Sequence, residues 1–237
     1  MIALAVLDVA LRAFVPTLAI GDSVPPLPLV DQDGRNFSLA DLRGDVVVVT
    51  FLYTSCGDVK ECPLIAAKFG RIQHAIGDAP IRLVALTLDP QHDTPARLRA
   101  FGAIYGADTS RWKLATGAPA VVEELDARLG VTSLTRRSTQ GFAHDDAAVV
   151  LDRSGRIAKI VPGNQWTPDD LLAVARSYAG APVDAWTGLR LWLAGAAERC
   201  GGGGGAFTTA GALATLALIF GAIAFAFSRA FAPRGEG

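Results

Sequence analysis

The hydrophobic positions of this chain alternate between runs typical of buried strands and spacings typical of amphipathic helices. The runs at 46–53 and 81–88 are continuous and rich in β-branched residues, which indicates strands covered on both faces. Between these runs, apolar residues from 64 to 76 recur at the spacing of one helix face. Further strands are predicted at 29–31, 36–37, 112–115, 147–151 and 156–161, and further helices at 95–105, 119–129 and 168–178.

The order of these elements predicts an α/β fold. Strands and helices alternate as far as residue 129, and two strands joined by a tight turn at 152–155 then precede a final helix. A strand that leads through a cysteine loop into a helix, closed by a hairpin and a last helix, is typical of a thioredoxin-like fold. We therefore predict a domain over 21–180 with a central mixed sheet flanked by helices.

A second hydrophobic feature lies at the C-terminal end. The stretch from 206 to 227 carries no charge, is long enough to cross a bilayer, and has no polar stripe of the kind that a surface helix shows. We predict a C-terminal transmembrane helix over 206–228, with a buried hairpin as the alternative. Arg229 and Arg234 follow it, which places the C-terminus in the cytoplasm and the domain on the outer, periplasmic face of the membrane.

The remaining segments complete the predicted organisation. Residues 1–20 are apolar but are interrupted by charges and a proline and lack a basic start, so we interpret them as a degenerate signal peptide. Residues 181–205 are predicted to form a linker, and 229–237 a short cytoplasmic tail. The predicted orientation requires an export signal, because a C-terminal span alone does not carry the domain across.

Charge and cysteine content narrow the functional classes. The 22 basic and 23 acidic residues leave a net charge of −1, which speaks against nucleic-acid binding. Three cysteines are too few for a disulfide-stapled miniprotein. Cys200, at the glycine run before the predicted span, is either incidental or the site of an intermolecular disulfide or a lipid.

The other two cysteines, Cys56 and Cys62, follow the buried strand at 46–53 directly. On a continuous helix their Cα atoms would lie about 9 Å apart, beyond the ~7 Å limit for a disulfide, so they can pair only if 57–61 form a loop. Pro63 suits a helix start, which would put Cys62 at the positive end of the helix and favour its thiolate. Such a pair can form a disulfide, exchange one, or bind a soft metal.

A histidine near the two cysteines would favour metal binding over the disulfide chemistries, because two thiolates and one imidazole favour copper. His74 is predicted on a solvated helix face and His92 in a surface turn. His144 directly precedes the strand at 147–151, and in a thioredoxin-like fold this loop approaches the cysteine corner. We predict His144 as the candidate ligand, with a solvent-exposed loop histidine as the alternative.

Four stretches then resemble one known family at matching order and distance. They are 21–34, the strand and first cysteine at 42–56, the Asp-Pro-x-x-Asp-Thr-Pro loop within 86–95, and the Trp…Thr-Gly segment at 112–117. These stretches are similar to the SCO/SenC family of membrane-anchored, thioredoxin-fold copper proteins. The resemblance covers about 21–178.

The resemblance implies a copper ion held by Cys56, Cys62 and His144. It implies as partner the copper-bearing subunit of cytochrome c oxidase or another copper chaperone. Asp145 or Asp146 could orient the imidazole, although both also suit an ordinary loop. The chain departs from the family in having five residues rather than three between the cysteines and a C-terminal rather than an N-terminal anchor.

Three functions therefore stay open at the sequence level. In the first, a membrane-anchored metallochaperone delivers copper to the oxidase or keeps the oxidase thiols reduced. In the second, a thiol-disulfide oxidoreductase uses Cys56 as the nucleophile and Cys62 to resolve the mixed disulfide. In the third, the chain senses copper or redox state across the membrane. Copper binding that depends on His144 would favour the first.

Overall fold

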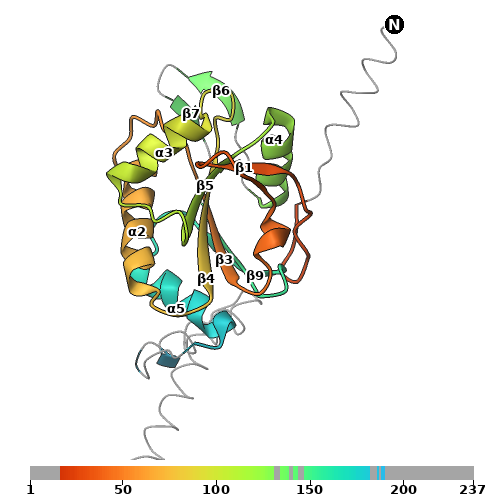
Figure 1. Ribbon diagram of the computed structural model, residues 1–237, viewed down its shortest axis with the longest axis vertical. Coiled ribbons are helices and arrows are strands. Elements are labelled where there is room, and N and C mark those ends of the chain that lie inside the picture. Colours follow the sequence, from red (N-terminus) through yellow and green to blue (C-terminus); the bar gives the residue numbers. More distant parts are fainter. Residues whose placement is uncertain are drawn as a thin grey trace, which may run out of the picture. The chain divides into compact units, whose positions relative to one another are not determined.

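One mixed sheet organises the domain in the computed structural model of the chain (Figure 1). The structure describes residues 17–130, 134–138, 141–143, 147–181, 186, 188 and 189. The strands are β1 (Leu29–Asp31), β2 (Asn36–Phe37), β3 (Val46–Leu52), β4 (Ile81–Thr87), β5 (Trp112–Thr116), β8 (Ala147–Leu151) and β9 (Ile157–Pro162). Their order in the sheet is β2-β1-β5-β4-β3-β8-β9, and β3, β4 and β5 run parallel.

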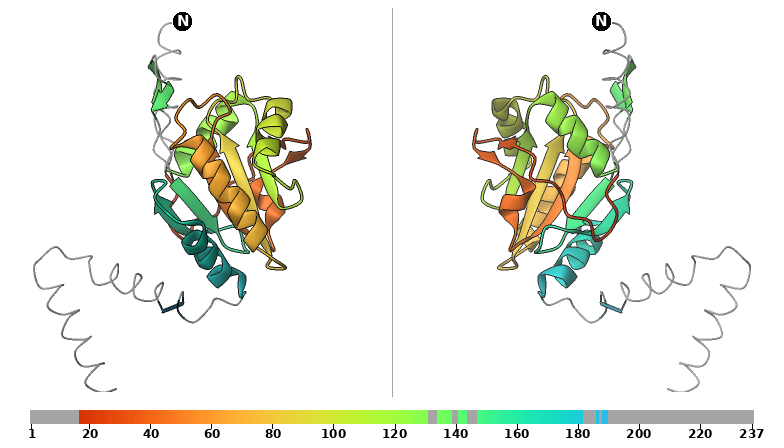
Figure 2. Two further views of the ribbon diagram at one scale, coloured as in Figure 1. Left: turned by 90° about the vertical axis from the view of Figure 1, so that its left-hand side faces the viewer. Right: turned by 90° about the vertical axis from the view of Figure 1, so that its right-hand side faces the viewer.

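Helices cover both faces of this sheet. They are η1 (Leu39–Leu42), α2 (Cys62–Ala75), α3 (Pro95–Ile104), α4 (Pro119–Arg128) and α5 (Pro168–Ala179). Figures 1 and 2 show α2, α3 and α5 on one face and α4 on the other. The layers and the mixed sheet confirm the predicted thioredoxin-like α/β fold.

The core is centred on β3. All seven of its residues are buried, because β3 pairs in parallel with β4 on one side and antiparallel with β8 on the other, while helices cover its faces. Beside it, the ring of Phe69 on α2 lies 5.8 Å from that of Trp112 and 6.2 Å from that of Trp166. The prediction of a strand covered on both faces is confirmed.

The observed boundaries lie within a few residues of the predicted ones. Thr94 and Thr167 cap α3 and α5, each accepting a hydrogen bond from a backbone N–H three residues on. One pair of strands was not predicted, namely β6 (Leu134–Ser138) with β7 (Gly141–Ala143). The sequence there, LTRRS and GFA, contains no continuous apolar run, so its hydrophobic pattern gives no strand signal.

Several predicted segments fall outside the described residues. These are the span at 206–228, most of the N-terminal segment, the C-terminal tail, and Cys200. Among the residues that the structure does describe, no helix combines the length and apolarity needed to cross a bilayer. The chain divides into two compact units at 184/185; in the second, residues 186, 188 and 189 are helical.

One buried carboxyl in α4 predicts a pH dependence of stability. Asp126 is 2% exposed, and its Oδ1 has no hydrogen-bond partner within the described part of the chain. Burial, with a smaller effect of the Glu123 charge, raises its pKa well above the ordinary value. The native state therefore keeps a proton that the unfolded chain loses near pH 4, so Asp126 lowers the free energy of unfolding increasingly as the pH rises above that value.

Replacing Asp126 by asparagine should remove this penalty. We expect the free energy of unfolding at pH 7 to rise by about 1–3 kcal/mol, with little change near pH 4. Urea denaturation of the full chain at both pH values measures the difference. A substitution that destabilises the chain equally at pH 4 and pH 7 would contradict this interpretation.

Candidate functional site

Two loops meet at the edge of the sheet where the parallel strands end. The loop after β3 carries Cys56, and the loop after β4 spans residues 88–94. Because β3 and β4 are parallel and pair Leu52 with Thr87, both loops leave the sheet at the same edge. In open α/β sheets the carboxyl ends of the strands are the usual place for a binding site. This edge is therefore the candidate site.

Cys56 and Cys62 occupy unequal environments at this edge. Cys62 is the first residue of α2 and is fully buried, while Cys56 is half-buried; neither sulfur is part of a disulfide. Pro63 is the second residue of the helix, which begins one residue before the predicted start, and the residues between the cysteines lie outside α2. One sulfur is thus accessible and the other is held inside the protein at a positive helix end.

The electrostatics of the pair favour a thiolate at Cys56. A hydrogen bond from the Cys62 side chain is the main cause that lowers the pKa of Cys56 to about 5, and it outweighs the opposing effect of burial. The backbone N–H groups of Cys62 and Asp58 and the hydroxyl of Tyr53 lower this pKa further. A thiolate is both the nucleophile in disulfide exchange and the form of cysteine that binds a metal.

The loop between the two cysteines is held by residues that lie far from it in the sequence. Asn164, in the loop between β9 and α5, donates its side-chain N–H to the carbonyl oxygen of Lys60 at 3.3 Å. The ammonium of Lys68 donates to the carbonyl oxygens of Asn164 and Trp166 and lies 4.7 Å from the centre of a Trp166 ring. The longer cysteine loop of this chain is therefore anchored through α2 and the β9–α5 loop.

A buried carboxylate joins the two loops of the site. Asp93 is 0% exposed, and it accepts hydrogen bonds from the backbone N–H of Thr54 at 3.0 Å, from the Thr54 hydroxyl, and from the Thr87 hydroxyl at 2.6 Å. The Thr54 bonds reach the segment two residues before Cys56. The sequence marked Asp93 only as part of a family motif; its direct support of the cysteine loop was not predicted.

The other histidines behave as predicted. His74 is exposed on α2, and the His92 side chain is 47% exposed in the loop after β4. The structure adds that Nδ1 of His92 lies 2.8 Å from Oδ1 of Asp89. This pairing within the turn fixes the orientation of the imidazole.

His144, Asp145 and Asp146 lie outside the described residues. The chain leaves this segment at Ala147, the first residue of β8, and the antiparallel register pairs Ala148 with Thr50 near the end of β3. The hydroxyl of Thr50 also donates to the carbonyl oxygen of Ala147 at 3.4 Å. The strand that follows His144 therefore starts at the same edge of the sheet as the cysteine loop.

The lowered pKa predicts a specific pH profile for Cys56. In a chain with Cys200 replaced by serine, the rate of alkylation by iodoacetamide should reach half its maximum near pH 5, the value of about 5 at which the thiol ionises. Cys62→Ala should shift this midpoint upward, because it removes the largest cause of the lowered pKa. A midpoint near the ordinary thiol value of about 8.5 in the chain that retains Cys62 would contradict the assignment.

Comparison with known proteins identifies the family of the domain. The family model described as SCO1/SenC matches residues 20–180. A SCO1 protein homolog of Bacillus subtilis strain 168 is 26% identical over 159 residues, which cover 65% of this chain and 81% of that relative.

Two solved structures share the fold and a quarter of the sequence. A SCO1/SenC family lipoprotein from Bacillus anthracis str. Ames is 25% identical, with a TM-score of 0.60 over 66% of this chain and 95% of that one. ScoI of Bradyrhizobium japonicum, solved with copper bound, is 25% identical, with a TM-score of 0.57 over 68% of this chain and 99% of that one. Because the family model covers nearly all of the described domain, which carries the cysteine pair after β3, the chain belongs to the SCO1/SenC family.

Proposed function

We propose that this chain binds one copper ion through Cys56, Cys62 and His144 and passes it to the copper-bearing subunit of cytochrome c oxidase. The observation that carries the proposal is the pair of reduced cysteines at one corner, one buried at a helix start and the other half-buried with a pKa of about 5. Copper is the cargo in this proposal, and the oxidase subunit is the partner that the family resemblance implies.

The donors in the structure fit such a cargo. Thiolates are soft ligands that select copper(I), and Cys56 is ionised at neutral pH. Cys62 would lose its proton on metal binding, as coordinating thiols do. The support for His144 is the register of β8, which brings the strand after it to the edge where the cysteines lie. The copper bound to the Bradyrhizobium japonicum relative gives independent support.

The two sulfurs differ in exposure, and this difference would allow copper to be transferred to a partner as well as bound. Transfer between proteins proceeds most easily when an incoming ligand can reach the metal from one side. Cys56 is half-buried, so a partner could approach the ion there, while Cys62 holds it from the protein side. The Asp93 hydrogen bonds and the Asn164 contact would keep the loop in place during this exchange.

Replacing His144 by alanine tests the proposed third ligand. The reduced full chain, titrated without oxygen against a chromophoric copper(I) chelator, should bind one equivalent, and His144→Ala should weaken that binding by about 10-fold or more. His74→Ala is the matched control, since His74 is exposed on α2. Unchanged copper affinity in His144→Ala would remove His144 from the proposed ligand set.

A second candidate function is thiol-disulfide exchange, and the unequal burial of the cysteines favours it. The accessible thiolate of Cys56 could attack a substrate disulfide, forming a mixed disulfide and releasing one substrate thiol. Cys62 could then attack the Cys56 sulfur, which releases the second substrate thiol and leaves a Cys56–Cys62 disulfide. Rapid reduction of a disulfide substrate by a chain whose copper affinity does not depend on His144 would support this function over copper delivery.

We further propose that residues 206–228 anchor the chain in the membrane with its domain on the outer face. The support is the uncharged length of this stretch and the two arginines after it. Alkaline phosphatase joined at Gly21 should be active, and green fluorescent protein joined at Gly237 should fluoresce. An active phosphatase at Gly237 would contradict the orientation.

A further inference from the structure

A second candidate site lies at the opposite edge of the sheet from the cysteines. It is a cleft of about 400 Å³ where β3, β4 and β5 begin, bordered by the β1–β2 turn and by η1. Asp45 directly precedes β3, and Thr109 lies in the segment before β5. The parallel strands therefore separate the cleft from the cysteines. The proposed copper site includes none of the residues that line the cleft.

The lining of the cleft is strongly basic. Five cationic side chains from four separate parts of the chain face two carboxylates. The cations are Arg35, Arg43, Arg82, Arg111 and Lys113. The chain as a whole has a net charge of −1, so this local excess of positive charge does not follow from the overall composition.

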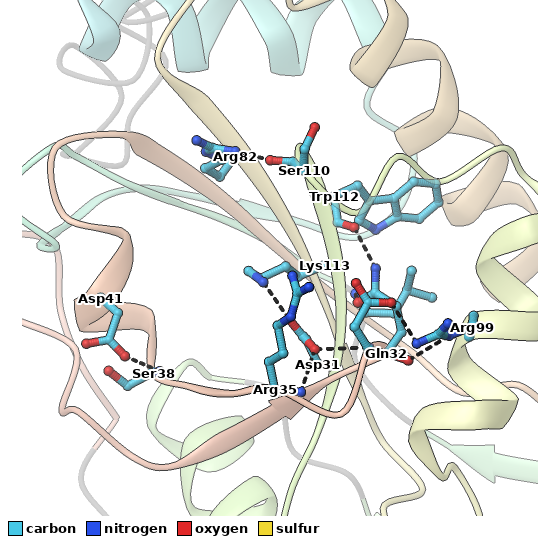
Figure 3. A network of polar contacts seen from close by, with 12 residues as sticks. Asp31, Gln32, Arg35, Ser38, Asp41, Arg82, Arg99, Ser110, Trp112 and Lys113 are labelled. Atoms are coloured by element: carbon cyan, nitrogen blue, oxygen red, sulfur yellow. Dashed lines mark hydrogen bonds and ion pairs between the residues drawn. The ribbon is translucent and has the colours of Figure 1, made fainter.

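The acidic groups of the cleft are already engaged by protein groups. Asp45 accepts a hydrogen bond from Nε of Arg82 at 2.7 Å, and Asp41 accepts one from the backbone N–H of Ser38 at 2.7 Å. Figure 3 shows the bond between Ser38 and Asp41 and the bond from Arg82 to the carbonyl oxygen of Ser110. Five cations against two carboxylates leave the lining with a net positive charge.

The side chain of Lys113 lines the cleft and is paired with Asp31. Its ammonium lies 2.6 Å from Oδ2 of Asp31 and 5.0 Å from the ring centre of Phe37. Figure 3 shows the side chain of Arg35 extending from the β1–β2 turn toward the same region. Asp31 offsets the charge of Lys113, so Arg35 is the cation of the two that is available to an added anion.

Two guanidinium groups of the cleft have no hydrogen-bond or ion-pair partner among the described residues. Within the described part of the chain, the side chains of Arg35 and Arg43 make no hydrogen bond or ion pair, while Arg111 uses one N–H on the carbonyl oxygen of Ala79 at 3.2 Å. A guanidinium presents five N–H donors in a planar fork that matches two oxygens of an anion. The hydroxyl of Thr109 also lines the cleft.

We propose that this cleft binds a phosphate-bearing ligand. A phosphate group offers several oxygens to donors arriving from different directions, as the arginines here do, and its charge is complementary to the unpaired guanidinium groups. The volume of about 400 Å³ lies in the range of small-molecule sites and accommodates a phosphate ester or diphosphate. A free phosphate compound and the head group of an anionic phospholipid share this chemistry.

Calorimetry on the full chain in a neutral detergent distinguishes the two sources. One titration uses pyrophosphate, and the other uses dihexanoyl phosphatidylglycerol, with dihexanoyl phosphatidylcholine as the zwitterionic control. We expect saturable binding of at least one anionic probe that weakens with added salt. Arg35→Gln and Arg43→Gln should each weaken it by about 5-fold or more, as loss of a charge-assisted contact does.

Arg71→Gln is the matched control, because Arg71 is exposed on α2 away from the cleft. It should leave the affinity unchanged, and all three variants should keep the thermal midpoint of the parent chain. The proposal is overturned if neither anionic probe binds, if the Arg71 variant loses as much affinity as the other two, or if an acidic peptide binds the cleft while both phosphate probes fail. None of these outcomes bears on the copper site.

Discussion

Replacing either Cys56 or Cys62 by serine should lower the affinity of the reduced chain for copper(I) by about 100-fold or more, because thiolates are the ligands that select this ion. The two losses should be similar in size although their causes differ. Cys56 supplies the accessible thiolate, and Cys62 supplies a buried sulfur and the hydrogen bond that lowers the pKa of its neighbour. Competition with a chromophoric copper(I) chelator measures both affinities.

Cys200→Ser is the control in the same assay, and it should bind copper as the parent chain does. A chain that lacks Cys56 or Cys62 but still binds one equivalent with the parent affinity would contradict the proposed site. The tryptophan fluorescence of the apo variants should match that of the parent chain, which separates the loss of a ligand from the loss of the fold.

The second large effect is expected at Asp93. Its carboxylate is fully buried and accepts hydrogen bonds from the Thr54 N–H, the Thr54 hydroxyl and the Thr87 hydroxyl. Asp93→Ala would leave these buried donors without partners, so we expect the free energy of unfolding to fall by about 3 kcal/mol or more. Urea denaturation followed by tryptophan fluorescence measures the change.

The loss of the Asp93 carboxylate should also affect the cysteine loop, because the Thr54 bonds lie two residues before Cys56. In the absence of denaturant, the alkylation profile of Cys56 should therefore change in Asp93→Ala. Asp78→Ala is the matched control, since Asp78 is exposed. Equal effects of the two substitutions on stability and on Cys56 would show that Asp93 does not support the site.

The fold could be predicted from sequence where local signals and burial agree. The β-branched run of β3 sits in the middle of the sheet, and the Thr-Pro pairs that begin α3 and α5 cap their helices as expected. Pro63 marked the start of α2, so the position of Cys62 at the helix end was also predictable.

The hydrogen bonds that hold the cysteine loop in place could not be predicted from the sequence, because they join residues that lie far apart along the chain. Asp93 reaches Thr54 across the sheet edge, and Asn164 reaches Lys60 although about a hundred residues separate them. The lowered pKa of Cys56 likewise follows from how Cys62 is oriented, which the spacing between the cysteines does not specify. The basic cleft was missed for the same reason, since its cations are scattered along the sequence.

The two edges of the sheet have different chemical characters. The edge where β3 and β4 end carries two cysteine sulfurs, which are soft ligands. It also carries the buried carboxylate of Asp93, which joins two loops through hydrogen bonds. The edge where the parallel strands begin carries guanidinium groups suited to hard oxygen anions. Copper delivery and phosphate binding, as proposed, would therefore use separate surfaces, and each can be removed by substitution without altering the other.

X-ray absorption at the copper edge tests the copper site most directly. The full chain loaded with one equivalent of copper(I) should show two sulfur neighbours and one nitrogen neighbour around the metal. The nitrogen should disappear in His144→Ala, and one sulfur should disappear in Cys56→Ser. A copper environment of sulfur alone, or one that none of these substitutions alters, would contradict a site made by Cys56, Cys62 and His144.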